Sequence, residues 1–67
     1  MNTVYKVIEI IGTSEKSWED AAKTAIETAS KSLKEIRVAE VKEMDINIDG
    51  RKMTYRVKLR VSFKFVA

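Results

Sequence analysis

The sequence has neither cysteine nor histidine among its 67 residues. Without cysteine there are no disulfides and no thiolate chemistry, and without both residues the ordinary zinc sites are excluded. The same two absences exclude Ser–His–Asp and Cys–His catalytic arrangements within one chain. No remaining group is visibly activated by its neighbours in sequence, so we expect a protein that is not an enzyme.

Long apolar runs are also missing. None approaches the roughly 20 residues that a membrane-spanning helix needs, and the start, Met1-Asn2-Thr3-Val4, lacks the basic and apolar regions of a signal peptide. Thirteen Lys and Arg stand against ten Asp and Glu, interspersed, for a net charge of +3. We expect a soluble cytoplasmic protein without a membrane partner.

The short length predicts one domain, spanning residues 1–67, with a thin core. A chain of this size buries only about 60% of the surface that its unfolded form exposes. Small domains usually compensate with disulfides, a structural metal or self-association. Because disulfides and zinc are excluded, self-association is the expected device.

The clearest pattern is the alternation from Lys52 to Val66, which predicts a strand with one apolar face and one mostly cationic face. The apolar positions are Met53, Tyr55, Val57, Leu59, Val61, Phe63 and Phe65. The cationic positions are Lys52, Arg56, Lys58, Arg60 and Lys64. Such a basic stripe is also a footprint for nucleic-acid binding. Nearby carboxylates and the small net charge argue against that partner, and we expect none.

A first strand is predicted over Val4–Ile11, which is rich in β-branched and aromatic residues. Both of its faces carry apolar side chains, which is typical of a central or interface-facing strand. The segment Gly12-Thr13-Ser14 is expected to break it.

A helix is predicted next, because Ser17 and Asp20 resemble a capping box and apolar residues follow at helical spacing. The apolar stripe comprises Trp18, Ala21, Ala22, Ala25, Ile26, Ala29, Leu33 and Ile36. Trp18 is interpreted as a packing anchor rather than a stacking platform, because it lies on the stripe.

The period returns to two from Arg37 to Ile48, and Asp49-Gly50 predicts a two-residue hairpin turn. The turn sets a pairing register between the two strands in which Glu43 opposes Arg56. From Lys42 onward this register would place polar residues opposite apolar ones, so a bulge or divergence of the strands is expected there. The predicted fold class is therefore α+β, in the order β-α-β-β.

The segments VYKVIEIIGTSEKSWEDAA, IRVAEVKEMD and YRVKLRVSFK together resemble the dodecin family over nearly the whole chain. The resemblance implies a three-stranded antiparallel sheet partly wrapped around its helix, assembled as a hollow homododecamer. It also implies small-ligand storage rather than turnover, because flavin-binding dodecins hold pairs of flavins, such as FMN, between subunits.

Two positions depart from the flavin-binding pattern. The stacking Trp of that pattern falls at Val38, and the Gln that binds the ring falls at Arg56. Stacking is worth about 1–3 kcal/mol per ring in nucleobase systems, so its loss predicts weakened flavin binding. Val38 and Arg56 are then pocket positions without the family's functional side chains.

These departures resemble the calcium-associated branch of dodecins. Glu43, Asp45 and Asn47 share one strand face and offer the oxygen ligands that Ca²⁺ prefers, although three are too few without symmetry copies. In the predicted register Arg56 opposes Glu43 and Lys52 opposes Asn47, which favours ion pairs and polar contacts instead. Both interpretations, a calcium site and a polar interface, stay open.

Overall fold

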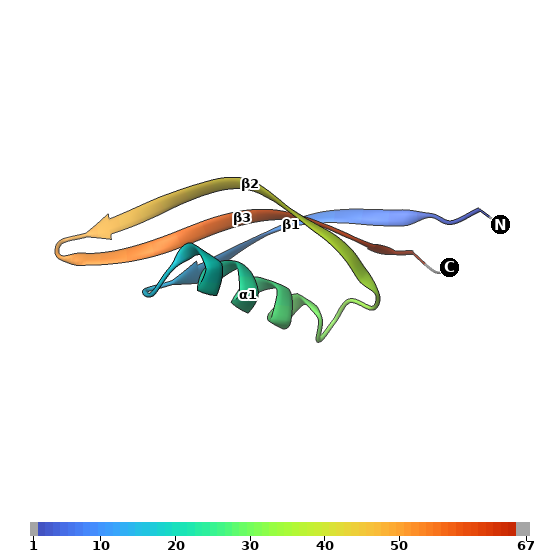
Figure 1. Ribbon diagram of the computed structural model, residues 1–67, viewed down its shortest axis with the longest axis horizontal. Helices are drawn as coiled ribbons and strands as arrows, with labels where there is room; N and C mark the ends of the chain where they lie inside the picture. Colours follow the sequence, from blue (N-terminus) through green and yellow to red (C-terminus); the bar gives the residue numbers. More distant parts are fainter. Residues whose placement is uncertain (1, 66–67) are drawn as a thin grey trace.

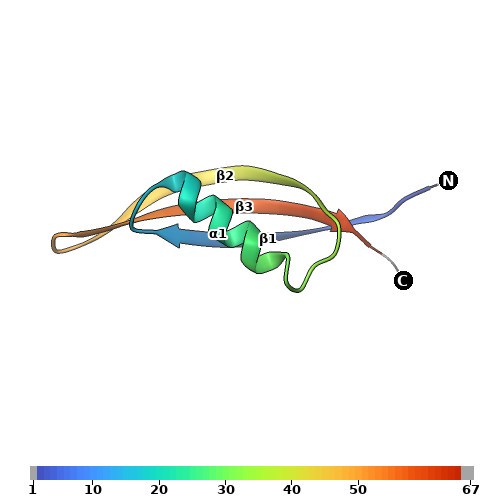
Figure 2. The same ribbon diagram turned by 60° about the horizontal axis from the view of Figure 1, so that its bottom comes forward.

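The computed structural model describes residues 2–65, in the element order β1 (Tyr5–Ser14), α1 (Trp18–Ala29), β2 (Ile36–Asp49) and β3 (Lys52–Lys64). The strands form one antiparallel sheet with β3 in the middle, in the order β1-β3-β2. The helix lies along one face of this sheet (Figures 1 and 2). The predicted α+β fold is confirmed. Among residues 2–65, no helix is long and apolar enough to cross a membrane.

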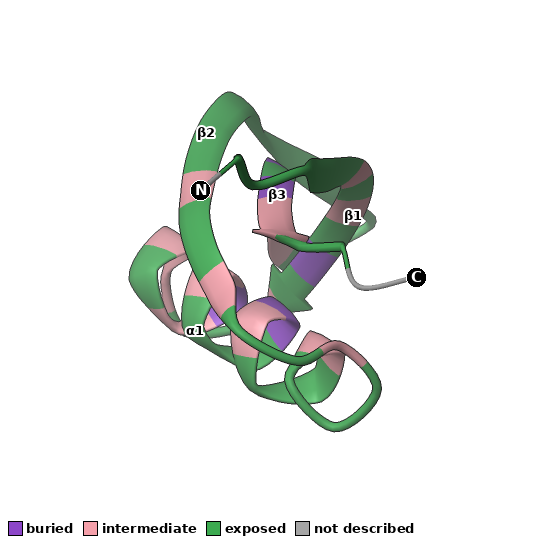
Figure 3. Ribbon diagram, turned by 90° about the vertical axis from the view of Figure 1, so that its right-hand side faces the viewer, coloured by how far each residue is buried: buried purple, intermediate pink, exposed green. Residues whose placement is uncertain are grey.

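The core lies between α1 and the central strand. Its buried apolar residues are Ala21, Ala25, Val57, Leu59 and Val61. Figure 3 shows that the buried positions gather where the helix faces β3 and β1, while β2 is almost entirely exposed. We call the face of the sheet that α1 covers the helix side, and the opposite face the outer face.

The predicted apolar face of the last strand is confirmed as the helix side of β3. Its middle positions are buried, but Met53 and Phe65, at the two ends, each remain 48% exposed because the helix does not reach them. The strand itself ends at Lys64. Val66, the predicted end, lies outside the described residues.

The predicted break at Gly12 is wrong, because β1 continues to Ser14. Gly12 is buried and pairs with Val57. A Cβ at this position would lie 2.1 Å from the carbonyl oxygen of Ala21 and 2.8 Å from the Cβ of Ala25. Glycine at this position therefore allows the helix backbone to approach the strand closely. It does not form a turn.

The predicted extension of the helix to Leu33 and Ile36 is also wrong. The helix ends at Ala29, and the Ser30 hydroxyl and amide both donate to the carbonyl of Ile26. Ile36 instead begins β2 and pairs with Phe63. Its side chain still packs against the core, so the helical spacing correctly identified an apolar contact but not the element that carries it.

The helix start is half of the expected capping box. The Ser17 hydroxyl accepts a hydrogen bond from the Asp20 amide at 3.0 Å. The Asp20 carboxylate, however, accepts from the Ser14 hydroxyl at 2.7 Å rather than from the Ser17 amide. The same Ser14 oxygen accepts from the Lys16 amide at 2.9 Å, so the end of β1 and the start of α1 are tied together.

The hairpin turn is one residue later than predicted. Asp49 pairs with Lys52, which leaves Gly50 and Arg51 as the two turn residues. Gly50 has φ of 62° and Arg51 is not among the described residues with positive φ, the pattern of a type II′ turn. The register therefore shifts by two residues, so side chains keep their predicted faces but change partners.

The bulge expected near Lys42 is confirmed by a register shift between Val41 and Glu43. A second shift lies between Ile36 and Val38. The shift between Val41 and Glu43 inserts one extra residue in β2. Val41 and Met44 therefore lie on the same side of the sheet, opposite Leu59 and Val57 respectively.

Candidate functional site

The outer face carries a chain of ion pairs across all three strands. The carboxylate of Glu9 in β1 lies 3.2 Å from Nη2 of Arg60 and 4.0 Å from Nζ of Lys58. Lys58 also lies 3.8 Å from Glu43 of β2. The cationic stripe of β3 is thus matched by carboxylates on both neighbouring strands.

The strongest of these contacts joins Arg56 to Asp45. The Arg56 Nε and Nη2 atoms donate to the two carboxylate oxygens of Asp45 at 2.7 and 2.8 Å, a bidentate geometry. Hydrogen bonding to Arg56 holds the pKa of Asp45 below its usual value, with a smaller contribution from the charge of Arg56. The same contact raises the pKa of Arg56. Sequence reasoning paired Arg56 with Glu43, which is wrong by two residues because the turn lies later.

An acid titration should reveal this pair. A carboxyl with a lowered folded pKa stabilises the protein above its unfolded pKa of about 3.9, and that contribution disappears as pH falls through the folded value. We therefore expect Asp45→Asn to lower the melting temperature slightly at pH 7, with the difference from the parent shrinking as the pH falls below the unfolded pKa of the Asp45 carboxyl. Asp49→Asn, on the same hairpin, is the control, because Asp49 has no ion pair within residues 2–65. A difference that persists at low pH would contradict the assignment.

Asp45 also connects the hairpin to the helix. The Trp18 Nε1 atom donates to the main-chain oxygen of Asp45 at 3.1 Å. The Trp18 ring meets Tyr55 edge-on, with centroids 5.2 Å apart and planes at 78°. Trp18 also packs against the core cluster, as expected of a packing anchor.

The three candidate calcium ligands lie in a row on the outer face, as predicted, but with other partners. Asp45 is held by Arg56, Glu43 faces Lys58, and Asn47 pairs with Thr54 rather than Lys52. Within residues 2–65 no group of three or more acidic side chains is arranged to hold a metal ion. One chain alone therefore does not fit calcium at this position.

Val38, predicted with Arg56 to lie at a ligand pocket, lines a shallow hollow at the far end of the outer face. The hollow has a volume of about 280 Å³ and is lined by Tyr5, Arg37, Val38 and Ser62. Val38 is 56% exposed and supplies no aromatic surface. Tyr5 and Arg37 were missed by the sequence analysis, because placing Tyr5 beside Val38 requires the strand order β1-β3-β2.

The two predicted pocket positions, Val38 and Arg56, share the outer face but are far apart within one chain. Val38 pairs with Ser62 and Arg56 lies six residues away along β3, a separation of about 20 Å at the usual strand rise. A single ligand of flavin size therefore meets both only if they come from different copies.

Most of the chain matches known proteins. The dodecin family model matches residues 4–66. Calcium dodecin of Mycobacterium tuberculosis is 57% identical over 63 residues, which cover 92% of this chain and 89% of that protein. Dodecin of Thermus thermophilus is 38% identical over 65 residues, covering 96% and 94% respectively.

Solved structures agree with the sequence matches. The crystal structure of M. tuberculosis calcium dodecin, described as calcium chelating with a novel calcium-binding site, has a TM-score of 0.90 at 55% identity and covers 96% of this chain and 93% of its own. Dodecin from Streptomyces davaonensis has a TM-score of 0.92 at 26% identity, with both chains fully covered. The protein therefore belongs to the dodecin family.

Proposed function

We propose that this chain is a non-catalytic dodecin whose single domain assembles into a homododecamer and holds a small ligand between subunits. Dodecins are oligomeric binding proteins. The observation that carries the proposal is the uncovered apolar surface, set against five buried apolar core residues within residues 2–65. On the outer face alone, Tyr5, Val7, Ile11 and Val38 are each at least half exposed. Burial of this apolar surface between copies is expected to add the free energy of unfolding that the small core does not supply.

The proposed ligand class follows from the side chains at the two pocket positions. Val38 offers no ring for stacking, and Arg56 already has its carboxylate partner on β2. Weak flavin binding is the consequence, because FMN would lack the stacking contact and would compete with Asp45 for Arg56.

The ion pairs of the outer face support the prediction of no nucleic-acid partner. Carboxylates pair with four of the five cationic side chains of the stripe, namely Lys52, Arg56, Lys58 and Arg60. Cytoplasmic location stays a prediction.

Calcium is the second candidate, favoured by the 57% identity to a calcium dodecin. Because one chain does not fit the ion, calcium binding requires oxygen ligands from more than one copy. Glu43 is the proposed contributor that is easiest to release, since its carboxylate lies 3.8 Å from Lys58 and its side chain is 68% exposed. Asp45 would first have to leave Arg56, and Asn47 would add an amide oxygen.

Calcium titration of the assembled protein tests this candidate. We expect measurable Ca²⁺ uptake by calorimetry, and Glu43→Gln is expected to weaken it by about tenfold, equivalent to about 1.4 kcal/mol. Glu27→Gln removes a carboxylate from the exposed side of α1 and should leave binding unchanged. Equal binding by parent and Glu43→Gln would remove Glu43 from the site. An assembly mass and melting temperature that are unaffected by chelator would remove calcium from the account.

A further inference from the structure

A second uncovered apolar surface lies on the helix side of the sheet, along β2. We call it the β2 stripe; it consists of Val41, Met44, Ile46 and Ile48 with Met53 of β3, exposed by 52, 54, 38, 69 and 48%. It stays uncovered because α1 packs mainly over β1 and β3, although the start of the helix crosses toward β2 (Figure 2). The bulge at Lys42 keeps Val41 and Met44 on one side, so no charged residue interrupts the stripe.

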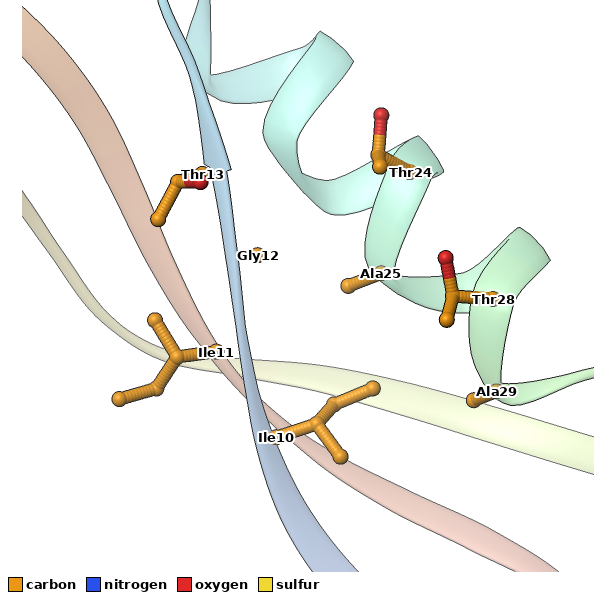
Figure 4. A pocket seen from close by; sticks show the side chains of 8 residues that line it. All are labelled: Ile10, Ile11, Gly12, Thr13, Thr24, Ala25, Thr28 and Ala29. Carbon is orange, nitrogen blue, oxygen red and sulfur yellow. The ribbon is translucent and has the colours of Figure 1, made fainter.

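The opposite edge of the same sheet carries an apolar groove. It lies between β1 and the flank of α1, has a volume of about 490 Å³, and is lined by no charged residue of the described part of the chain. Figure 4 shows Ile10 and Gly12 on one wall and Ala25, Thr28 and Ala29 on the other. The hydroxyl groups of Thr24 and Thr28 are the side-chain polar groups that the helix contributes to this groove.

The stripe and the groove are positioned to meet between copies. Both lie on the helix side of the sheet, at its two open edges, since β2 and β1 are the outermost strands. A second copy that places its β2 beside β1 continues the sheet and brings its stripe against the open flank of α1. Edge strands have unpaired main-chain groups suited to such an addition.

We propose that the β2 stripe of one copy docks into the β1–α1 groove of the next, in a head-to-tail contact. This inference rests on the proposed self-assembly and identifies the surfaces that carry part of it. Because the two surfaces differ, the contact is heterologous and closes into a ring when the rotation between copies allows it.

The absence of charge on both surfaces, within residues 2–65, favours a second copy over other occupants. A charged peptide or a lipid headgroup would find no counter-charge in the groove or on the stripe. A second copy supplies one uncharged apolar stripe for each uncharged apolar groove.

Disulfide trapping tests the contact, because the native chain has no cysteine. The double variant Ile48→Cys/Thr28→Cys places one thiol on the stripe and one at the groove, and mild oxidation should give a ladder of dimers and larger products on a non-reducing gel. Each single variant should remain mostly monomeric on that gel. Asp49→Cys/Thr28→Cys is the matched control, since Asp49 adjoins Ile48 on the outer face, and it should give no ladder.

Several results would overturn the proposal. If Ile48→Cys alone forms dimers, the stripe packs against itself; if the double variant forms no ladder while the native protein is assembled, the stripe and groove do not meet. Both leave self-assembly intact, whereas a native protein that sediments as a 7.7 kDa monomer removes both proposals. As a second readout, Ile48→Lys should reduce the assembled fraction at least tenfold, whereas Asp49→Lys, at an exposed outer-face position beside Ile48, should not. If the native protein does not assemble but binds phosphatidylcholine vesicles, and the Ile48→Lys variant does not bind them, the stripe is a lipid-binding surface instead.

Discussion

Replacing Val38 by tryptophan together with Arg56 by glutamine is expected to tighten FMN binding by about 5- to 150-fold for each bound flavin. The range follows from stacking worth about 1–3 kcal/mol per ring and from tenfold per 1.4 kcal/mol. The first substitution supplies an aromatic face in the hollow that Val38 now lines. The second removes the guanidinium that Asp45 holds. Fluorescence quenching during a flavin titration measures the change.

Two controls separate stacking from simple apolar bulk. Val38→Leu adds volume without a ring and should leave FMN binding near that of the parent. Arg56→Gln alone should give only a small gain, since it adds no stacking surface. If Val38→Trp binds FMN no better than Val38→Leu, Val38 does not lie against the flavin.

Gly12→Ala is expected to cause the largest loss of stability. The new Cβ would meet the Ala21 carbonyl oxygen at 2.1 Å, and that atom belongs to the helix backbone and cannot rotate away. The helix must therefore shift from the sheet, at a cost at or above the roughly 1–3 kcal/mol typical of overpacked cores. For a domain of this size such a cost lowers the melting temperature by about ten degrees or more.

Gly50→Ala is the matched control for Gly12→Ala. No atom of residues 2–65 lies within 4 Å of a Cβ at Gly50, so this substitution meets only the strain of φ at 62°. Its expected cost is about 1 kcal/mol. Equal losses of melting temperature for the two variants would show that steric contact with α1 is not what requires glycine at position 12.

The fold was predictable where a single pattern had a single cause. Alternation along β3 identified Val57, Leu59 and Val61 as core because only a strand with one covered face produces it. Gly12 was misread because glycine marks both turns and close backbone approach, and only the position of α1 distinguishes them. Leu33 continued the helical period by chance, beyond the point where Ser30 caps the helix.

The site was less predictable, because it depends on partners across strands. A turn at Gly50 and Arg51 instead of Asp49 and Gly50 moves every partner by two residues, so the faces were correct while the Asp45–Arg56 pair was missed. Glu9 could not be assigned to the ion-pair chain without knowing that β1 lies beside β3. The β2 stripe required the length of α1 and its position over the other two strands.

A native mass spectrum of the purified protein, recorded before and after adding FMN, tests the central claim most directly. The claim is that this chain keeps the dodecin assembly while its flavin site has lost the groups that hold the ring. The predicted result is a dodecamer that takes up less FMN than the Val38→Trp/Arg56→Gln variant at the same FMN concentration. A monomer, or a dodecamer that takes up as much FMN as that variant, would contradict it.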